Sequence, residues 1–194
     1  MVHGYAADAK WFATLAAIDE EFAGKVKAAG CGDCGGPLDR ADYDRKPRGD
    51  LGESADAFAR RRSFCCRREG CRHRATPPSV RFLGRKVYVA VLVVIASVLG
   101  RERRIVGRGS GRHVEGVPVR TVRRWLNWWQ IAFVLGPFWI EANGLFARPV
   151  DETALPTSLL ARFAVPATNA VTALLRLIAP ITTTSVEAPI AMPM

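Results

Sequence analysis

The fold of this 194-residue chain is decided by two short stretches of sequence, Cys31-Gly-Asp-Cys34-Gly-Gly-Pro37 and Phe64-Cys65-Cys66-Arg-Arg-Glu-Gly-Cys71. Together they contain all five cysteines of the chain. Two thiolates separated by two residues and followed by glycines can grip one side of a tetrahedral metal ion. Gly70 can take the positive φ that a tight turn before Cys71 requires. The spacing predicts one Zn²⁺ held by four ligands: Cys31, Cys34, Cys66 and Cys71.

The fourth ligand position has two candidates, Cys65 and Cys66. Neighbouring residues on an extended strand point to opposite faces, so only one of the two can easily reach the ion. Cys66 is favoured because fewer residues separate it from Cys71, although the sequence leaves the choice open. We interpret His73 as a phosphate contact or a bystander, and reduced cysteines without a metal are the alternative to the whole site.

The interpretation of the cysteines also depends on the compartment. The segment from Trp11 to Val26 does not resemble a secretory signal peptide, because three consecutive acidic residues, Asp19, Glu20 and Glu21, interrupt it. In a reducing cytosol, paired cysteines act as metal ligands before they form disulfides. We therefore expect a cytoplasmic, nucleoid-associated protein.

The sequence around the cysteines predicts a helix and a β-hairpin. Residues 9–28 carry apolar side chains at helical spacing, and Gly30 is a suitable stop. Residues 37–43 would form the strand that leaves the first cysteine turn, and residues 60–64 the strand that enters the second. The open end of this hairpin would be closed by zinc. The apolar face of the helix consists of Trp11, Leu15, Ile18, Phe22 and Val26.

A continuous apolar segment runs from Val87 to Leu99 and is followed by Gly100. Its 13 residues fall short of the roughly 20 that a transmembrane helix needs, and they are long for a single strand. We favour a buried helix that ends at Gly100. The strand and the membrane helix remain alternatives.

The positive charge of the chain is concentrated in residues 60–124. This block holds eighteen Arg or Lys residues and three acidic ones, a balance of +15 within a net charge of +10. Seventeen of the eighteen are Arg, whose planar donors suit phosphates and guanine edges. Such a block favours contact with nucleic acid, because each neutralised phosphate releases condensed counterions. The arginines expected to grip the phosphate backbone are Arg67, Arg68, Arg72 and Arg74.

Residues 118–135 are predicted to form a second amphipathic helix, with Pro118 in its first turn. Its buried stripe would consist of Val119, Val122, Leu126, Trp129 and Phe133. Four polar side chains lie off that stripe in the half of a recognition helix that faces the bases, and Arg suits guanine while Asn suits adenine. These four are Arg120, Arg123, Arg124 and Asn127. A helix with merely solvated arginines is the alternative, and the size of Trp125 and Trp128 indicates a further packing surface.

A family resemblance is carried by three motifs, Cys31-x-x-Cys34, Arg62-Ser-Phe-Cys65-Cys66 and Cys71-Arg-His-Arg74. They are similar to the N-terminal zinc ribbon of bacterial insertion-sequence transposases and their short DNA-binding regulators. Residues 117–130 resemble the recognition helix of the helix-turn-helix that follows the ribbon in those families. The resemblance implies double-stranded DNA as the ligand and a transposase or integrase as a protein partner, and it leaves a homodimer open.

An enzymatic function is not expected. Beyond residue 125 the only carboxylates are Glu141, Asp151, Glu152 and Glu187, too few for a two-metal site. The chain has no phosphate-cradling loop of the Walker type.

The expected fold class is mostly α with a small β zinc ribbon, in which the zinc-ribbon hairpin precedes a helix-turn-helix-like helical module. The expected parts are an N-terminal helix (1–30), the ribbon (31–78), the helical DNA-binding module (79–148), a C-terminal helical segment (149–181) and a disordered tail (182–194). The expected function is a DNA-binding accessory or regulator of a mobile element. The alternatives are a zinc-ribbon module that docks a larger enzyme and a membrane-associated protein with a zinc-ribbon head.

Overall fold

A computed structural model describes residues 9–46, 48, 59–83, 88–102, 113–114, 116–163 and 167–183. The chain forms two compact units. Unit 1 comprises residues 1–5 and 91–174, and unit 2 comprises residues 6–90 and 175–194. Helices predominate and the sheets are small and antiparallel, which confirms the prediction of a mostly α fold with a small β part.

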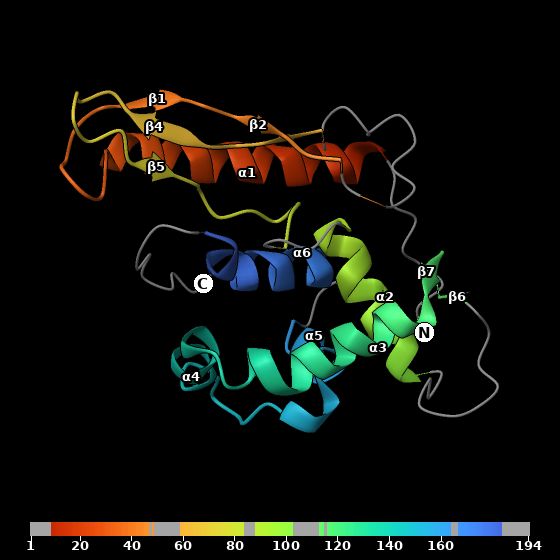
Figure 1. The fold of residues 1–194 in the computed structure, drawn as a ribbon. Coiled ribbons are helices and arrows are strands. Elements are labelled where there is room, and N and C mark those ends of the chain that lie inside the picture. Colours follow the sequence, from red (N-terminus) through yellow and green to blue (C-terminus); the bar gives the residue numbers. More distant parts are fainter. Residues whose placement is uncertain are drawn as a thin grey trace. The chain divides into compact units, whose positions relative to one another are not determined.

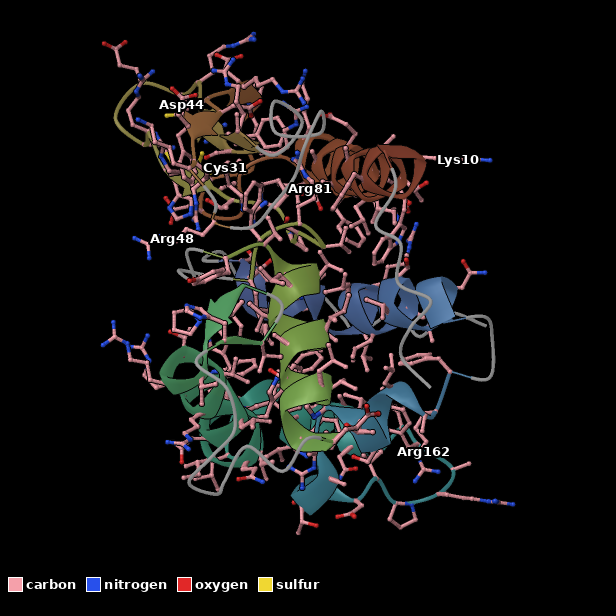
Figure 2. The ribbon with its side chains drawn as sticks, turned by 90° about the vertical axis from the view of Figure 1, so that its right-hand side faces the viewer. Lys10, Cys31, Asp44, Arg48, Arg81 and Arg162 are labelled. Carbon is pink, nitrogen blue, oxygen red and sulfur yellow. The ribbon has the colours of Figure 1, made fainter. Side chains whose placement is uncertain are left out.

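Unit 2 begins with helix α1 (Ala9–Ala29), which confirms the helix predicted at residues 9–28. The face of α1 that holds Trp11, Leu15 and Ile18 is buried, whereas Lys10 points out into solvent (Figure 2). Gly30 ends the helix as predicted, because its φ of +79° lies in the left-handed region that favours glycine.

The β part of unit 2 consists of two small antiparallel sheets (Figure 1). Strand β1 (Leu38–Arg40) pairs with β4 (Phe64–Cys66), and β4 pairs with β5 (Arg74–Ala75). The chain segments that contain β1 and β4 pair a second time, where β2 (Tyr43–Asp44) lies antiparallel to β3 (Arg60–Arg61). The predicted pairing of residues 37–43 with 60–64 is confirmed, and β5 adds a third strand that the sequence did not indicate.

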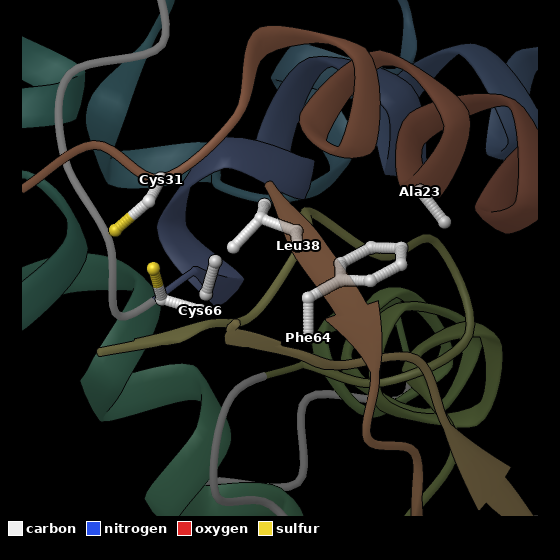
Figure 3. Close-up of a cluster of buried hydrophobic side chains, with 6 residues drawn as sticks. Ala23, Cys31, Leu38, Phe64 and Cys66 are labelled. Carbon is white, nitrogen blue, oxygen red and sulfur yellow. The ribbon is translucent and has the colours of Figure 1, made fainter. Parts of the chain in front are cut away.

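Helix α1 packs on the three-stranded sheet through one apolar cluster (Figure 3). Because the strands are only two or three residues long, side chains from α1 and from the cysteine turns supply much of their packing. The buried members of the cluster are Ala23, Cys31, Leu38, Phe64, Cys66 and Ala75.

A buried ion pair joins α1 to the segment after β5. Asp19 is fully buried, and its carboxylate accepts hydrogen bonds from Arg81 Nε at 2.8 Å, Ser79 Oγ at 2.6 Å and the Val80 backbone N–H at 2.7 Å. A buried carboxylate is tolerated only when such partners replace its hydration. Asp19, which interrupts the apolar pattern of the sequence, therefore fixes where residues 79–81 cross the helix.

The last part of the chain completes unit 2. Helix α6 (Ala167–Ile178) crosses the boundary between the units and is followed by the 3-10 turn η5 (Ala179–Thr182). Arg176 pairs with Glu21 at 3.2 Å, and the Thr182 hydroxyl accepts a hydrogen bond from the Ser79 N–H at 2.9 Å. Thr182, where the disordered tail was expected to begin, is buried, and residues 184–194 lie outside the described residues.

The apolar segment of residues 87–99 forms helix α2 (Ala90–Glu102), which confirms the prediction of a buried helix. The prediction that Gly100 ends it was wrong, because the helix continues through Gly100 to Glu102. A glycine inside a helix costs only about 1 kcal/mol relative to alanine, which the burial of the preceding valines outweighs. In the described part of the chain, no helix combines the length and the apolar character needed to cross a bilayer.

A short hairpin precedes the main helix of unit 1. Strands β6 (His113–Val114) and β7 (Val117–Pro118) pair, and Gly116 takes a φ of +72° in the turn between them. Helix α3 (Val119–Trp128) then begins directly after Pro118 and continues as the π-helical turn η3 (Trp129–Phe133). Residues 103–112 and 115, between α2 and α3, lie outside the described residues.

The helices that follow are short: α4 (Pro137–Asn143), the 3-10 turn η4 (Glu152–Ala154) and α5 (Thr157–Leu160). Gly136 turns the chain from η3 into α4, and a β-carbon there would approach the carbonyl oxygens of Ala132 and Phe133 to 3.2 Å. The ring of Phe133 lies at the centre of an aromatic cluster, 4.8 Å from Trp129 and 5.0 Å from Trp139.

Candidate metal centre

Four of the five cysteines come together at one end of the three-stranded sheet. Their sulfur atoms all lie within 4.8 Å of one another and could hold a metal ion. The Cys31 and Cys71 sulfurs are 3.8 Å apart, and the Cys34 and Cys66 sulfurs are 3.5 Å apart. A tetrahedral ion bound to thiolates at about 2.3 Å separates its ligands by about 3.8 Å. The four sulfur atoms therefore fit one tetrahedral ion.

The first pair of cysteines is held by a tight backbone turn. The Cys31 N–H donates to the Gly36 carbonyl at 2.8 Å, and the Gly35 N–H donates to the Cys31 carbonyl at 2.7 Å. Gly35 takes a φ of +67°, which an L-residue rarely adopts. The turn brings the Cys31 and Cys34 side chains into one cluster, as their spacing predicted.

The second pair is held by an equivalent turn after β4. The Cys66 N–H donates to the His73 carbonyl at 2.8 Å, and the Arg68 N–H approaches the Cys66 sulfur at 3.4 Å. Gly70 takes a φ of +83°, as predicted, and Arg72 also has a positive φ, of 50°. The Arg67 N–H donates to the Pro37 carbonyl at 2.9 Å and ties this turn to the first one.

Cys65 lies outside the cluster. Its sulfur contacts the Arg72 carbonyl at 3.4 Å, while the fully buried Cys66 sulfur faces Cys31 (Figure 3). The alternation of side chains along β4 separates the two neighbours, and the register of Leu38 opposite Cys66 fixes which of them faces the α1 side. The structure therefore places Cys66, and not Cys65, among the four clustered thiols.

The thiols of the cluster differ in acidity. Hydrogen bonds from the backbone of Cys34 and Asp33 lower the pKa of the Cys31 thiol to about 7. Burial raises the pKa of the Cys66 thiol. A backbone hydrogen bond from His73 lowers the pKa of Cys71, but burial and the three neighbouring thiols outweigh it and raise that pKa to about 12. A cation that binds here would displace the retained protons, since thiolates are the ligands.

The arginines next to the cluster are engaged within the protein. Arg67 makes a forked contact with the carboxylate of Asp39, with its closest N···O distance at 2.5 Å. Arg68 donates to the Cys34 carbonyl at 3.0 Å. Arg74 donates to the Ala41 carbonyl and to the Ser63 hydroxyl. Arg72 is exposed.

Other bases of unit 2 are also paired with acidic residues from the first sixty positions. Arg62 pairs with Asp42 and Glu20, and Arg60 approaches Asp44 at 3.5 Å. The Ser63 N–H and the Arg62 guanidinium both donate to Asp42, and they hold the pKa of its carboxyl below its usual value despite partial burial. These ion pairs could not be predicted from the sequence, because strand register and packing decide which acidic residue lies beside which arginine.

In unit 1, α3 and η3 separate a buried apolar side from an exposed polar side, as predicted except that Val119 of the predicted buried stripe is only half-buried. Val122, Trp125, Leu126 and Trp129 are buried on one side. All four of the polar side chains proposed for base recognition are exposed: Arg120, Arg123, Arg124 and Asn127. Trp125 was not part of the predicted stripe, and its burial beside Val122 and Leu126 makes the buried side of α3 wider than predicted, while Trp128 is half-buried.

The +15 block of residues 60–124 is divided between the two units. Unit 2 contains eighteen basic and thirteen acidic residues, whereas unit 1 contains ten basic and five acidic ones. Basic residues outnumber acidic ones by five in each unit, but unit 2 contains more acidic residues with which its bases can pair. Residues 103–112, between α2 and α3, contribute further basic residues to unit 1 and lie outside the described part of the chain.

The chain was compared with protein-family models, curated proteins and solved structures, and none of them matches it.

Proposed function

We propose that this protein is a non-catalytic, zinc-containing protein that binds double-stranded DNA through the exposed side of α3. The observation that carries the proposal is the separation of that helix into a buried apolar side and an exposed side with three arginines and Asn127. An accessory or regulator of a transposase or other mobile element is the class that fits the motifs of the sequence.

Zinc is the proposed metal because the donor set consists of four thiolates. Tetrahedral thiolate sites of this size are typical of structural Zn²⁺, which has no open coordination position for chemistry. In unit 2 the metal would join two turns that otherwise rest on strands of two or three residues. We therefore assign the Cys31, Cys34, Cys66 and Cys71 centre a structural role as a zinc ribbon.

The α3 helix is the better supported DNA contact of the two units. Arg67, Arg68 and Arg74 already hold protein groups, and a phosphate would have to compete with Asp39 for Arg67. Arg120, Arg124 and Asn127 are exposed together on one face of α3, and residues in the N-terminal half of a recognition helix commonly enter the major groove. Arg72 is the ribbon residue that we retain as a backbone contact.

The test is a fluorescence-anisotropy titration of labelled duplex DNA across a range of salt concentrations. We expect Arg124→Ala or Asn127→Ala to cost about 1–3 kcal/mol on a selected site and to relax specificity at one base position. Arg148→Ala is the matched control, because Arg148 is an exposed arginine of the same unit outside α3. Wild-type binding should weaken steeply with salt.

Two results would reject this function. The first is binding that does not change with salt. The second is an Arg124→Ala variant that binds as Arg148→Ala does on both selected and random duplex. Either outcome would favour the alternative in which the chain docks a larger protein.

A further inference from the structure

Unit 2 buries more positive than negative charge. Among the residues that the structure describes, three charged side chains are at most 2% exposed: Asp19, Arg61 and Arg81. Asp19 forms an ion pair with Arg81 at 2.8 Å, and it also accepts hydrogen bonds from Ser79 and Val80. One carboxylate can neutralise only one of the two buried guanidinium groups. These three side chains therefore leave one positive charge without a counter-charge, and burying such a charge is costly.

The surplus charge lies on Arg61, in strand β3. Its Nη2 donates to the Pro77 carbonyl and approaches the Thr182 carbonyl at 3.5 Å. Its Nη1 is buried and finds no acceptor in the part of the chain that the structure describes. Burial lowers the pKa of the Arg61 guanidinium, and the nearby charges of Arg81 and Arg45 lower it further in spite of one nearby carboxylate. This nitrogen therefore lacks a negatively charged acceptor.

Three arginines from separate segments of unit 2 converge on one aromatic ring. The guanidinium carbons of Arg45, Arg61 and Arg81 lie 5.3, 5.9 and 5.2 Å from the centre of the Phe82 ring. Arg45 follows β2, Arg61 is part of β3 and Arg81 follows β5 (Figure 2), so the fold gathers them. A ring face attracts a cation, but three cations around one ring also repel one another. We call these four residues the arginine site.

We infer that the arginine site binds a phosphate group. A phosphate group is negatively charged and its oxygens are arranged tetrahedrally, so it can accept hydrogen bonds from more than one guanidinium at once. A carboxylate has two coplanar oxygens, which suit the fork of a single arginine. Arg45 is half-buried, whereas Arg61 and Arg81 are buried. The phosphate would therefore enter on the side of Arg45 and accept from Nη1 of Arg61.

The phosphate group has two sources with the same chemistry, a free phosphate ion and the backbone of DNA. The second source rests on the proposed DNA function and would give the duplex a contact in unit 2 besides α3. The first source does not depend on that function. Binding of the ion can therefore be measured without DNA, and duplex can then be added as a competitor.

Isothermal titration calorimetry of the full chain with sodium phosphate tests the inference, at an ionic strength held constant with sodium chloride. We expect wild type to bind one phosphate ion per chain and to bind acetate at least about ten-fold more weakly, because acetate engages fewer guanidinium groups. Arg45→Gln should weaken phosphate binding by at least about ten-fold, the effect of losing one hydrogen bond between charged groups. Arg61→Gln should abolish it, provided that circular dichroism shows the variant to be folded.

Arg60→Gln is the matched control. Arg60 is the neighbour of Arg61 on β3, and its side chain is 61% exposed on the opposite side of the strand. The substitution removes the same charge from unit 2 without touching the arginine site. Phosphate affinity should stay within about two-fold of wild type, because exposed charges contribute little.

Three results would overturn the inference. The first is wild type that binds no phosphate up to about 10 mM, ten times a Kd of about 1 mM. The second is equal phosphate affinity in Arg45→Gln and Arg60→Gln, and the third is acetate that binds as tightly as phosphate.

Competition with DNA identifies the source of the phosphate group. Duplex that displaces phosphate from wild type would support the inference with the DNA backbone as the source. Duplex that binds without displacing phosphate would support it with the free ion as the source. A chain that binds phosphate and no duplex would refute the proposed function and leave this inference standing.

Discussion

Among single residues, Gly36 is the most constrained by the metal centre. A β-carbon at this position would approach the sulfur atoms of Cys34 and Cys66 to 3.2 Å each. Both are neighbours that cannot withdraw without changing the distances within the cluster. Glycine is therefore required here by the close approach of two ligands, and its backbone φ is not the reason.

We predict that Gly36→Ala weakens metal binding by about ten-fold or more, in the range of other changes next to metal ligands. The added methyl would push the two sulfurs away from the distances of a tetrahedral site. Gly32→Ala is the matched control, because Gly32 lies in the same turn and a β-carbon there would meet nothing within 4 Å. Competition with a chromophoric chelator measures both affinities, and equal affinities would contradict the role of Gly36.

At the residue scale, the sequence predicted the clustered cysteines but not their neighbours. The choice of Cys66 over Cys65 followed from the two-residue period of a strand and from chain spacing, both of which are local. The pairing of Arg67 with Asp39 and the burial of Asp19 against Arg81 depend on residues 28 and 62 positions apart in sequence. Only strand register and helix packing bring such residues together.

Among the elements, α1 and α2 were predicted well because apolar periodicity or continuity extends over many residues. The short strands β5, β6 and β7 were not predicted, since two residues carry no period. The end of α2 was misplaced because a single glycine is a weak stop when the helix around it is buried. The helix-turn-helix remains a proposal: residues 103–118 separate α2 from α3, and the described part of that segment contains the β6–β7 hairpin.

The elements of unit 2 give a prediction about metal removal. The short strands β1 and β4 and the two cysteine turns share one small apolar cluster, so ligation should supply folding free energy that this cluster lacks. A chelator should increase deuterium exchange at the Cys66 and Arg67 amides, which donate to His73 and Pro37. The amides of α3 should keep their protection.

The control for this experiment is the same chelator added to Cys65→Ser protein, which should respond as wild type does. Loss of protection throughout α3 at the same chelator concentration would show that the two units unfold together. Unchanged exchange at Cys66 would show that the metal does not support the sheet.

At the scale of the whole molecule, the sequence showed that residues 60–124 are strongly basic, but not how these basic residues are divided between the two units or paired with acidic residues. Four acidic residues of the first sixty positions pair with bases of residues 60–81 in unit 2: Asp19, Asp39, Asp42 and Asp44. The charge of the block is therefore less available there than the count of eighteen bases suggested. Where a chain divides into units is set by long-range contacts, which composition does not encode, so the division inside the basic block was not foreseen.

The measurement that tests the central claim most directly is the zinc content of freshly purified protein by elemental analysis, for wild type, Cys65→Ser and Cys66→Ser. Wild type and Cys65→Ser should each contain about one zinc ion per chain, and Cys66→Ser should lose it, because a structural site of this type needs four ligands. Zinc that is retained in Cys66→Ser and lost in Cys65→Ser would contradict the assignment of the ligands. Wild type without zinc would contradict the metal centre itself.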